Sequence, residues 1–338
     1  MKKQLIGLMF IIGFTIFACD KDEVIPTEEV GASLDGILDQ TRLVATGARI
    51  TELGTGFGFT EGPAKDKNGN IFFTDQPNDK IHKWSVADNK VSTFVTVCGR
   101  SNGMAFDKDG NLITCADYKG ELRKYKPDGT FEILVKDYNG KLLNGPNDVW
   151  INPITGGMYI TDPIFPRGYW DAGDPRQQPW EPKRSEQAAT GKGGHVYYLA
   201  PGAKTLTRVT TMAEWEADSW PNGVVGTPDG KKLYVNKWAG NNMGGTWVFD
   251  VNADGTLTNI KKFTAMGGDG MAMDEKGNVY ISNGFGITAF NPSGNRILNI
   301  PIAGATNCSF AGADNKTLFI TGPTNAINSV KMNVKGSE

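Results

Sequence analysis

One pattern recurs six times along this chain of 338 residues and constrains its fold more than any other feature. Each copy opens with a polar residue and a small one, then continues as an apolar run, a turn rich in Asp, Gly and Asn, and a second apolar run. The six opening residues are Glu61, Asn102, Asn147, Asn222, Asp269 and Asn307. A period of about forty residues built from strand-like segments and turns is typical of β-propeller blades. The sequence therefore predicts an all-β, six-bladed propeller with four-stranded blades.

The second copy shows the expected plan of a blade most clearly. Apolar runs on either side of the Asp109-Gly110 turn predict a hairpin, and two further strands are predicted over residues 120–125 and 130–135. Asp-rich turns also follow other openers, but none has the spacing and flanking helices of a calcium-binding EF-hand loop. We interpret these turns as hairpins.

The opening residues should lie at one height, because equivalent positions in the blades are related by rotation about one axis. Four of them, Glu61, Asn147, Asn222 and Asp269, offer two carboxylates and two amide oxygens, donors that suit Ca²⁺, Mg²⁺ or Mn²⁺. Asn and Asp before Gly also favour turns. For the remaining two openers, Asn102 and Asn307, a purely structural role is an equal alternative.

The N-terminal segment predicts export and lipidation. Two lysines precede an apolar core over residues 5–17, which ends at Ala18-Cys19. This arrangement resembles a bacterial lipoprotein signal over residues 1–19, with Cys19 acylated; an ordinary secretory signal is the alternative. Residues 20–50 are interpreted as a polar tether and lead-in, and residues 51–334 as the propeller. The expected location is the cell envelope, anchored by lipid to the outer membrane on its periplasmic or external side.

The interval between the third and fourth openers is longer than the others. Its surplus, at about residues 163–193, is rich in Pro, Gly and charge and includes Tyr169, Trp170 and Trp180. Long insertions in compact domains are often functional, so these aromatic residues favour a lid over the mouth of the channel.

Composition and single motifs exclude several other classes of protein. A net charge of −2 provides no basic patch for nucleic acid. The expected oligomeric state is a monomer. The odd number of cysteines after the leader, Cys98, Cys115 and Cys308, predicts buried thiols and no disulfide framework. A Gly-x-Ser-x-Gly match around Ser101 lacks the helix that a nucleophile elbow needs. Only two histidines are present, which disfavours a histidine-rich zinc site and a quinone-dependent sugar dehydrogenase.

The motifs around the openers resemble the gluconolactonase, regucalcin (senescence marker protein) and luciferin-regenerating-enzyme superfamily over about residues 55–325. Each motif is weak alone, but their order and spacing together are specific. They are Phe59-Thr60-Glu61-Gly62-Pro63, Phe73-Thr74-Asp75-Gln76-Pro77-Asn78-Asp79, Asn144-Gly145-Pro146-Asn147-Asp148 with Tyr159-Ile160-Thr161-Asp162-Pro163, Pro221-Asn222-Gly223-Val224 and Gly268-Asp269-Gly270-Met271.

The resemblance implies a six-bladed propeller that hydrolyses a small sugar lactone with one divalent metal. By motif, the metal ligands fall on Glu61, Asn147, Asn222 and Asp269. Ca²⁺ is the expected ion, with Mg²⁺, Mn²⁺ and Zn²⁺ as alternatives. Asp269 is then the expected base that activates water, while Glu61 keeps the charge of the site near neutral.

The expected substrate contacts depart from the family pattern at one position. Relatives active on aldonolactones can carry an Arg two residues before the second ligand, where this chain has Gly145. Arg100 stands two residues before Asn102 in the neighbouring blade. We expect Arg100 and Asn102 to bind sugar hydroxyls.

A protein without catalytic activity is the main alternative. A surface propeller lipoprotein could keep the ring as a structural metal site and bind a glycan or another protein through the aromatic insertion. Fold class alone does not decide between these functions. The intact set of four oxygen donors favours hydrolysis.

Overall fold

The computed structural model describes residues 31–163, 194–212, 215, 220–238, 244–322 and 325–337. The predicted leader with Cys19, the first part of the tether and nearly all of the predicted insertion at 163–193 lie outside the described residues. Among the described residues, no helix is both long and apolar enough to cross a membrane.

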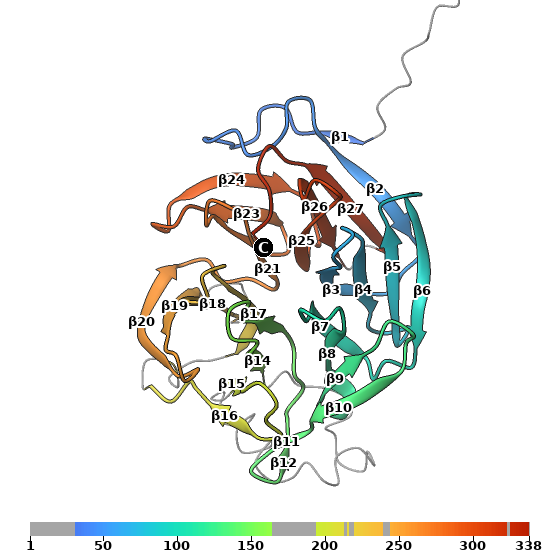
Figure 1. The fold of residues 1–338 in the computed structure, drawn as a ribbon. Coiled ribbons are helices and arrows are strands. Elements are labelled where there is room, and N and C mark those ends of the chain that lie inside the picture. The colour runs from blue at the N-terminus through green and yellow to red at the C-terminus, as the bar shows by residue number, and fades with distance from the viewer. Residues whose placement is uncertain are drawn as a thin grey trace, which may run out of the picture. The chain divides into compact units, whose positions relative to one another are not determined.

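The described chain forms six antiparallel four-stranded blades around a common axis, which confirms the predicted propeller (Figure 1). From the first blade to the sixth, the innermost strands are β3 (Thr60–Lys65), β7 (Ser101–Phe106), β13 (Val149–Ile151), β17 (Pro221–Gly226), β21 (Met271–Met273) and β25 (Asn307–Ala311). The second strands are β4 (Ile71–Asp75), β8 (Leu112–Ala116), β14 (Met158–Asp162), β18 (Lys232–Lys237), β22 (Val279–Ser282) and β26 (Thr317–Thr321).

The outer half of each blade follows the same order. The third strands are β5 (Lys80–Ser85), β9 (Glu121–Tyr125), β15 (His195–Leu199), β19 (Thr246–Val251), β23 (Gly286–Phe290) and β27 (Ala326–Lys331). The outermost strands are β6 (Lys90–Thr96), β10 (Phe131–Val135), β16 (Leu206–Arg208), β20 (Leu257–Thr264), β24 (Arg296–Pro301) and β2 (Arg49–Thr55). Short additional elements are β1 (Ala32–Ser33), η1 (Asp117–Lys119), β11 (Asp137–Tyr138) and β12 (Lys141–Leu142).

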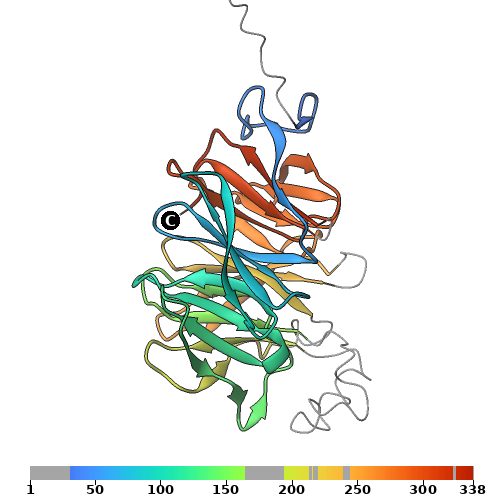
Figure 2. The ribbon, with the colours of Figure 1, turned by 90° about the vertical axis from the view of Figure 1, so that its right-hand side faces the viewer.

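The sixth blade joins the two ends of the described chain. Strand β2 pairs antiparallel with β27, with Thr51 opposite Ser329, so the blade combines one N-terminal strand with three C-terminal ones. Figure 2 shows β2, in light blue, beside the red C-terminal strands. The compact unit begins at Gly31, and Leu34 and Leu43 are buried in the core of the last two blades. The chain therefore packs against the propeller well before residue 51, where the sequence predicted that the domain begins.

The core lies between neighbouring blades, and strand periodicity explains it. Successive side chains of a strand point to opposite faces. In β4, Phe73 packs in a cluster with Phe319 of the sixth blade, whereas Phe72 packs in a cluster with Met104 and Tyr125 of the second. Because each second strand is covered on both sides, it is a continuous apolar run followed by polar residues.

Two local predictions, the hairpin turn after the first opener and the buried cysteines, are also confirmed among the described residues. The turn at Asp66 joins β3 to β4, and its carboxylate accepts hydrogen bonds from the amides of Asn68 and Asn70, as expected of a hairpin turn. The three cysteines among the described residues, Cys98, Cys115 and Cys308, are free and buried.

Candidate functional site

The opening residues lie where the innermost strands depart from regular pairing. In β7, Ser101 pairs with Ala116 and Met104 with Thr114, so Asn102 and Gly103 together face one residue of β8. A corresponding bulge holds Asn222 in β17, and another directly follows Glu61 in β3. A β-bulge bends its strand and turns side chains away from the regular alternation. The bulges therefore set the direction of these openers.

The small residues after the openers allow neighbouring blades to touch near the axis. A Cβ atom on Gly62 would overlap the carbonyl oxygen of Asn102, and one on Gly223 would overlap that of Asp269. The Gly223 amide also donates to the Asp269 carbonyl at 2.8 Å. Only glycine permits these contacts, which explains the small residue in the repeat.

Hydrogen bonds between adjacent blades form a closed ring around the axis. The six links, in blade order, are Thr74 Oγ1 to Asn102 O (3.2 Å), Gly103 N to Asn147 O (2.6 Å), Val224 N to Asp148 Oδ2 (3.1 Å), Gly223 N to Asp269 O (2.8 Å), Gly270 N to Thr306 O (2.8 Å) and Asn307 Nδ2 to Glu61 Oε2 (3.0 Å). Each link joins one blade to the next, and the last joins the sixth blade to the first, so all six junctions between neighbouring blades are bonded. The relative positions of the openers are therefore fixed by contacts that run through all six blades.

Glu61 is a buried carboxyl group close to another carboxylate. Its Oε2 accepts hydrogen bonds from the Gly62 amide at 2.9 Å and from Asn307 Nδ2 at 3.0 Å. Burial, and after it the negative charge of Asp269, raises the pKa of Glu61 well above its ordinary value. Glu61 is therefore close enough to feel the charge of Asp269, and such a pair of like charges is stabilised by a proton or a cation.

Three asparagine openers present side-chain amides that lack protein partners. Asn102, Asn147 and Asn222 are only 6%, 5% and 5% exposed, yet their side chains make no hydrogen bond to the residues that the structure describes. These amides are not among the fully buried polar atoms without a partner in the described residues, so they keep access to open space and can accept a ligand. Asn307 differs because its amide is used to hold Glu61. The Asn307 amide therefore serves the structure by binding Glu61, whereas the Asn102 side chain makes no hydrogen bond to the described residues.

This donor set fits a divalent cation. Glu61 and Asp269 supply negative charge, and Asn147 and Asn222 supply amide oxygens, which are the ligand types that Ca²⁺ and Mg²⁺ prefer. Within the described ranges, no group of three or more His, Cys, Asp or Glu side chains could hold a metal. A site of two carboxylates and two amides does not require such a group.

Two other predicted residues have distinct positions. Ser101 is fully buried; its hydroxyl donates to the Cys98 carbonyl at 2.8 Å and lies 3.0 Å from Thr114 Oγ1, contacts expected of a structural residue. Arg100 precedes it in the connection between β6 and β7. The Nε atom of Arg100 is buried and has no hydrogen-bond partner in the part of the chain that the structure describes.

Sequence reasoning missed Asp148, which follows an opener where the other blades have a small residue. Its Oδ1 accepts from the Val149 amide at 2.9 Å, and its Oδ2 links the third blade to Val224. Burial outweighs these hydrogen bonds and raises the pKa of Asp148 to about 7. The replacement of a small residue by Asp at this repeat position was the available signal.

A second missed group is a set of polar side chains near the end of each second strand. They bind openers or their neighbours; for example, Thr161 Oγ1 accepts from the Asp148 amide at 3.0 Å, and Asn236 Nδ2 donates to the Asp269 carbonyl at 3.1 Å. The set comprises Thr74, Thr114, Thr161, Asn236, Ser282 and Thr321. Each follows an apolar residue at the same position of the repeat, so the pattern was present in the sequence.

The axial cavity lies on one side of the ring. Its volume is about 810 Å³, and it is lined by the innermost strands from Gly62 and Asp148 to the hairpin turns near Asp107 and Thr227. The four predicted metal ligands do not line it. The candidate site is therefore separate from most of this cavity.

Comparison with known proteins agrees with this arrangement. A family model described as the SMP-30/Gluconolactonase/LRE-like region matches residues 59–324. The chain belongs to this family. That match covers all six openers, and the family predicted from the motifs is confirmed.

Individual members of the family are distant in sequence. A gluconolactonase from Zymomonas mobilis is 28% identical over 323 residues, covering 87% of this chain and 83% of that protein. Diisopropyl-fluorophosphatase from Loligo vulgaris is 27% identical over 290 residues, covering 77% and 84%. The crystal structure of a gluconolactonase from Xanthomonas campestris has a TM-score of 0.73 at 26% identity and covers 89% of this chain and 97% of its own.

Proposed function

We propose that this protein hydrolyses a sugar lactone with the help of one divalent cation held by Glu61, Asn147, Asn222 and Asp269. The observation that carries the proposal is the buried Glu61 carboxyl group, whose pKa is raised by burial and by the nearby charge of the partly exposed Asp269, together with the Asn147 and Asn222 amides, which make no hydrogen bond to the described residues. Family membership and similarity to two gluconolactonases support the reaction class. When bound at such a site, a cation polarises a carbonyl group and makes water easier to deprotonate.

Asp269 is the proposed base. It is partly exposed, whereas Glu61 is buried and has one oxygen occupied by Gly62 and Asn307. Asp269 would take a proton from water as the water oxygen adds to the lactone carbonyl carbon. The ring C–O bond then breaks, and the proton passes to the released ring oxygen, giving the open hydroxy acid.

Arg100 and Asn102 are the proposed substrate contacts. The Nε atom of Arg100 is buried without a hydrogen-bond partner among the described residues, and the Asn102 side chain is 6% exposed and makes no hydrogen bond to them. A hydroxyl group can donate to an amide oxygen and accept from a guanidinium, so a polyhydroxylated ring suits this pair. Binding energy from these contacts would orient the carbonyl toward Asp269.

The direct test is a hydrolysis screen with a pH indicator. Protein treated with a chelator and then dialysed is compared with the same protein after Ca²⁺, Mg²⁺, Mn²⁺ or Zn²⁺ is restored, using glucono-, galactono- and xylonolactone as substrates. We expect activity that disappears with the metal and returns with it. Full activity in protein shown to be free of metal would contradict the cation requirement, and inactivity on every lactone with metal restored would contradict the reaction.

Two variants separate the roles of the carboxylates. Asp269→Asn keeps an oxygen donor but cannot take a proton, so kcat should fall by about a hundredfold or more while part of the metal is retained. Glu61→Gln should lower the metal content itself. Asp66→Ala, which alters a carboxylate that only binds a hairpin turn, is the matched control. A normal kcat for Asp269→Asn would remove Asp269 as the base.

Similarity to Loligo diisopropyl-fluorophosphatase makes an organophosphate the second candidate substrate. Diisopropyl fluorophosphate therefore belongs in the same screen, with fluoride release as the signal. Faster turnover of that compound than of every lactone would favour this candidate.

A further inference from the structure

The connection between β6 and β7 contains unusual backbone conformations. Val97, Gly99 and Arg100 have φ angles of 61°, 73° and 51°. Positive φ is rare in residues other than glycine, and it is an outlier for a β-branched residue such as Val97. Conformations of this kind persist only when surrounding contacts enforce them, and they are concentrated at functional sites. This turn, defined as residues 97–100, is held from two sides.

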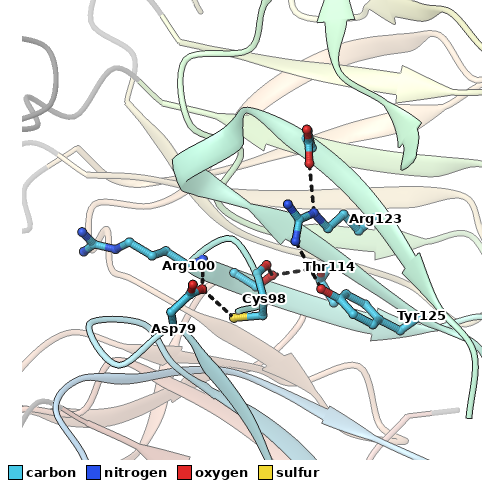
Figure 3. Close-up of polar contacts among 8 residues, drawn as sticks. Asp79, Cys98, Arg100, Thr114, Arg123 and Tyr125 are labelled. Carbon is cyan, nitrogen blue, oxygen red and sulfur yellow. Dashed lines mark hydrogen bonds and ion pairs between the residues drawn. The ribbon is translucent and has the colours of Figure 1, made fainter. Parts of the chain in front are cut away.

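Asp79 of the first blade holds the turn from one side (Figure 3). Its Oδ1 accepts the Arg100 amide at 2.6 Å and the Cys98 thiol at 3.4 Å, while its carbonyl accepts the Cys98 amide at 3.2 Å. Hydrogen bonds to a carboxylate are stronger than those between neutral groups. One residue therefore fixes both ends of a three-residue stretch.

Arg123 of the second blade supports the turn from the other side. A Cβ atom on Gly99 would lie 2.9 Å from the Arg123 guanidinium carbon, so the turn lies directly against this group. Arg123 is itself fixed by a 2.9 Å ion pair with Glu121, a hydrogen bond to Tyr125 and stacking over the Phe131 ring. The turn thus sits between a carboxylate and a rigid guanidinium.

The Arg100 side chain leaves this cluster. Figure 3 shows its guanidinium extending away from Arg123 and Tyr125, while its backbone amide faces Asp79. Its buried Nε has no hydrogen-bond partner within the described residues. The backbone at Arg100 is therefore tightly held, and its side chain is left with an unused donor.

We propose that Asp79 is a positioning residue, which holds the turn 97–100 so that Arg100 is preset to donate hydrogen bonds to the hydroxyl groups of a sugar lactone. This inference rests on the proposed function. Asp79 does not touch the substrate; it removes the cost of ordering Arg100 at the moment of binding. Asp79 therefore affects how tightly the substrate binds, whereas Asp269 acts on the chemical step.

The test compares KM and kcat among Asp79→Ala, Asp79→Asn and Arg100→Ala. Asp79→Ala should raise KM on the order of tenfold and change kcat by less than about threefold, because ordering is lost while the chemical step is intact. Asp79→Asn keeps an oxygen for the Arg100 amide and should restore most of the affinity. In the Arg100→Ala background, Asp79→Ala should raise KM no further, because the residue through which it acts is gone.

Asp66→Ala is the matched control, since it removes a carboxylate that binds backbone amides in the same blade but away from the turn. Melting temperatures identify any variant that fails to fold. If Asp79→Ala does not fold, Asp79→Gly, which suits the φ of 55° at this position and also lacks the carboxylate, takes its place and should raise KM by a similar factor. Unchanged KM in Asp79→Ala, or additive effects of Asp79→Ala and Arg100→Ala, would overturn the positioning role while leaving lactone hydrolysis intact. An inactive wild-type protein would overturn both proposals.

Discussion

Asp148 is a buried acid on the propeller axis that serves the structure through its two oxygens. Each oxygen accepts one backbone amide, from Val149 and from Val224 of the next blade. Its surroundings also favour the protonated form, because burial raises its pKa to about 7. The ionised form is therefore tolerated at neutral pH at a cost in stability.

This shift predicts a pH dependence of stability in protein freed of metal. The pKa of Asp148 is about 7 in the folded state and roughly 3.9 in an unfolded chain, so the folded state binds more protons between these values. Its contribution to stability is present at low pH and is lost as pH rises through this window. The melting temperature should fall by on the order of 5 °C from this group.

Asp148→Asn provides the comparison for that measurement. Asparagine has nearly the same shape and does not titrate, so the variant should show a flatter profile between pH 4 and about pH 7. Thermal melts of both proteins in the presence of chelator would check this. Parallel profiles would mean that Asp148 ionises at its ordinary pKa.

At the scale of elements, the contacts between bulged strands make the glycines after the openers sensitive to substitution. Gly223→Ala would push a methyl group into the Asp269 carbonyl of the next blade. We expect a loss of about 1–3 kcal/mol in the free energy of unfolding, together with weaker metal binding because Asp269 is displaced.

Gly54→Ala in β2 is the control for this effect, since its added methyl would meet no atom closer than 3.4 Å. Chemical denaturation and metal titration of both variants separate the local clash from the general effect of replacing glycine. Equal behaviour of the two variants would contradict the tight contact at the ring.

The elements also show which features a sequence can predict. The innermost strands and their turns were predicted because apolar runs and turn residues such as Asp109-Gly110 are local signals. The hydrogen bond from Asn307 to Glu61 was not, because it joins residues 246 positions apart that meet only when the ring closes. The contacts of Asp79 were not predicted either, because its partners Cys98 and Arg100 lie 19 and 21 residues away in the connection between β6 and β7. The repeat could place the openers at one height, but the contacts that fix their relative positions come from neighbouring blades.

At the scale of the whole molecule, closure by β2 predicts graded effects of N-terminal truncation. A chain that starts at Gly31 should melt like one with residues 20–30 present, because the compact unit begins there. Starting at Arg49 removes the buried Leu34 and Leu43, at a cost of roughly 1.5–3 kcal/mol each. Starting at Gly56 removes β2 and leaves β27 as an unpaired edge, which promotes association between chains.

Melting temperature and size-exclusion chromatography of the three truncations would measure this order. The chain that starts at Gly31 is the control for removal of the N-terminal segment alone. If the chain that starts at Gly56 were as stable and as monomeric as that control, the pairing of β2 with β27 would not matter for closure.

The pairing of β2 with β27 also determines when the propeller can close during protein synthesis. During translation, β2 leaves the ribosome before the strands of the first five blades, and β27 leaves it after them. The two strands therefore cannot pair until translation is nearly complete. Non-local pairings of this kind form slowly and leave nascent chains open to misassembly. Because Asn307, which binds Glu61, belongs to the same last blade, a polypeptide interrupted before residue 307 would lack the contact that holds Glu61 in the proposed cation site, however many blades it had already folded.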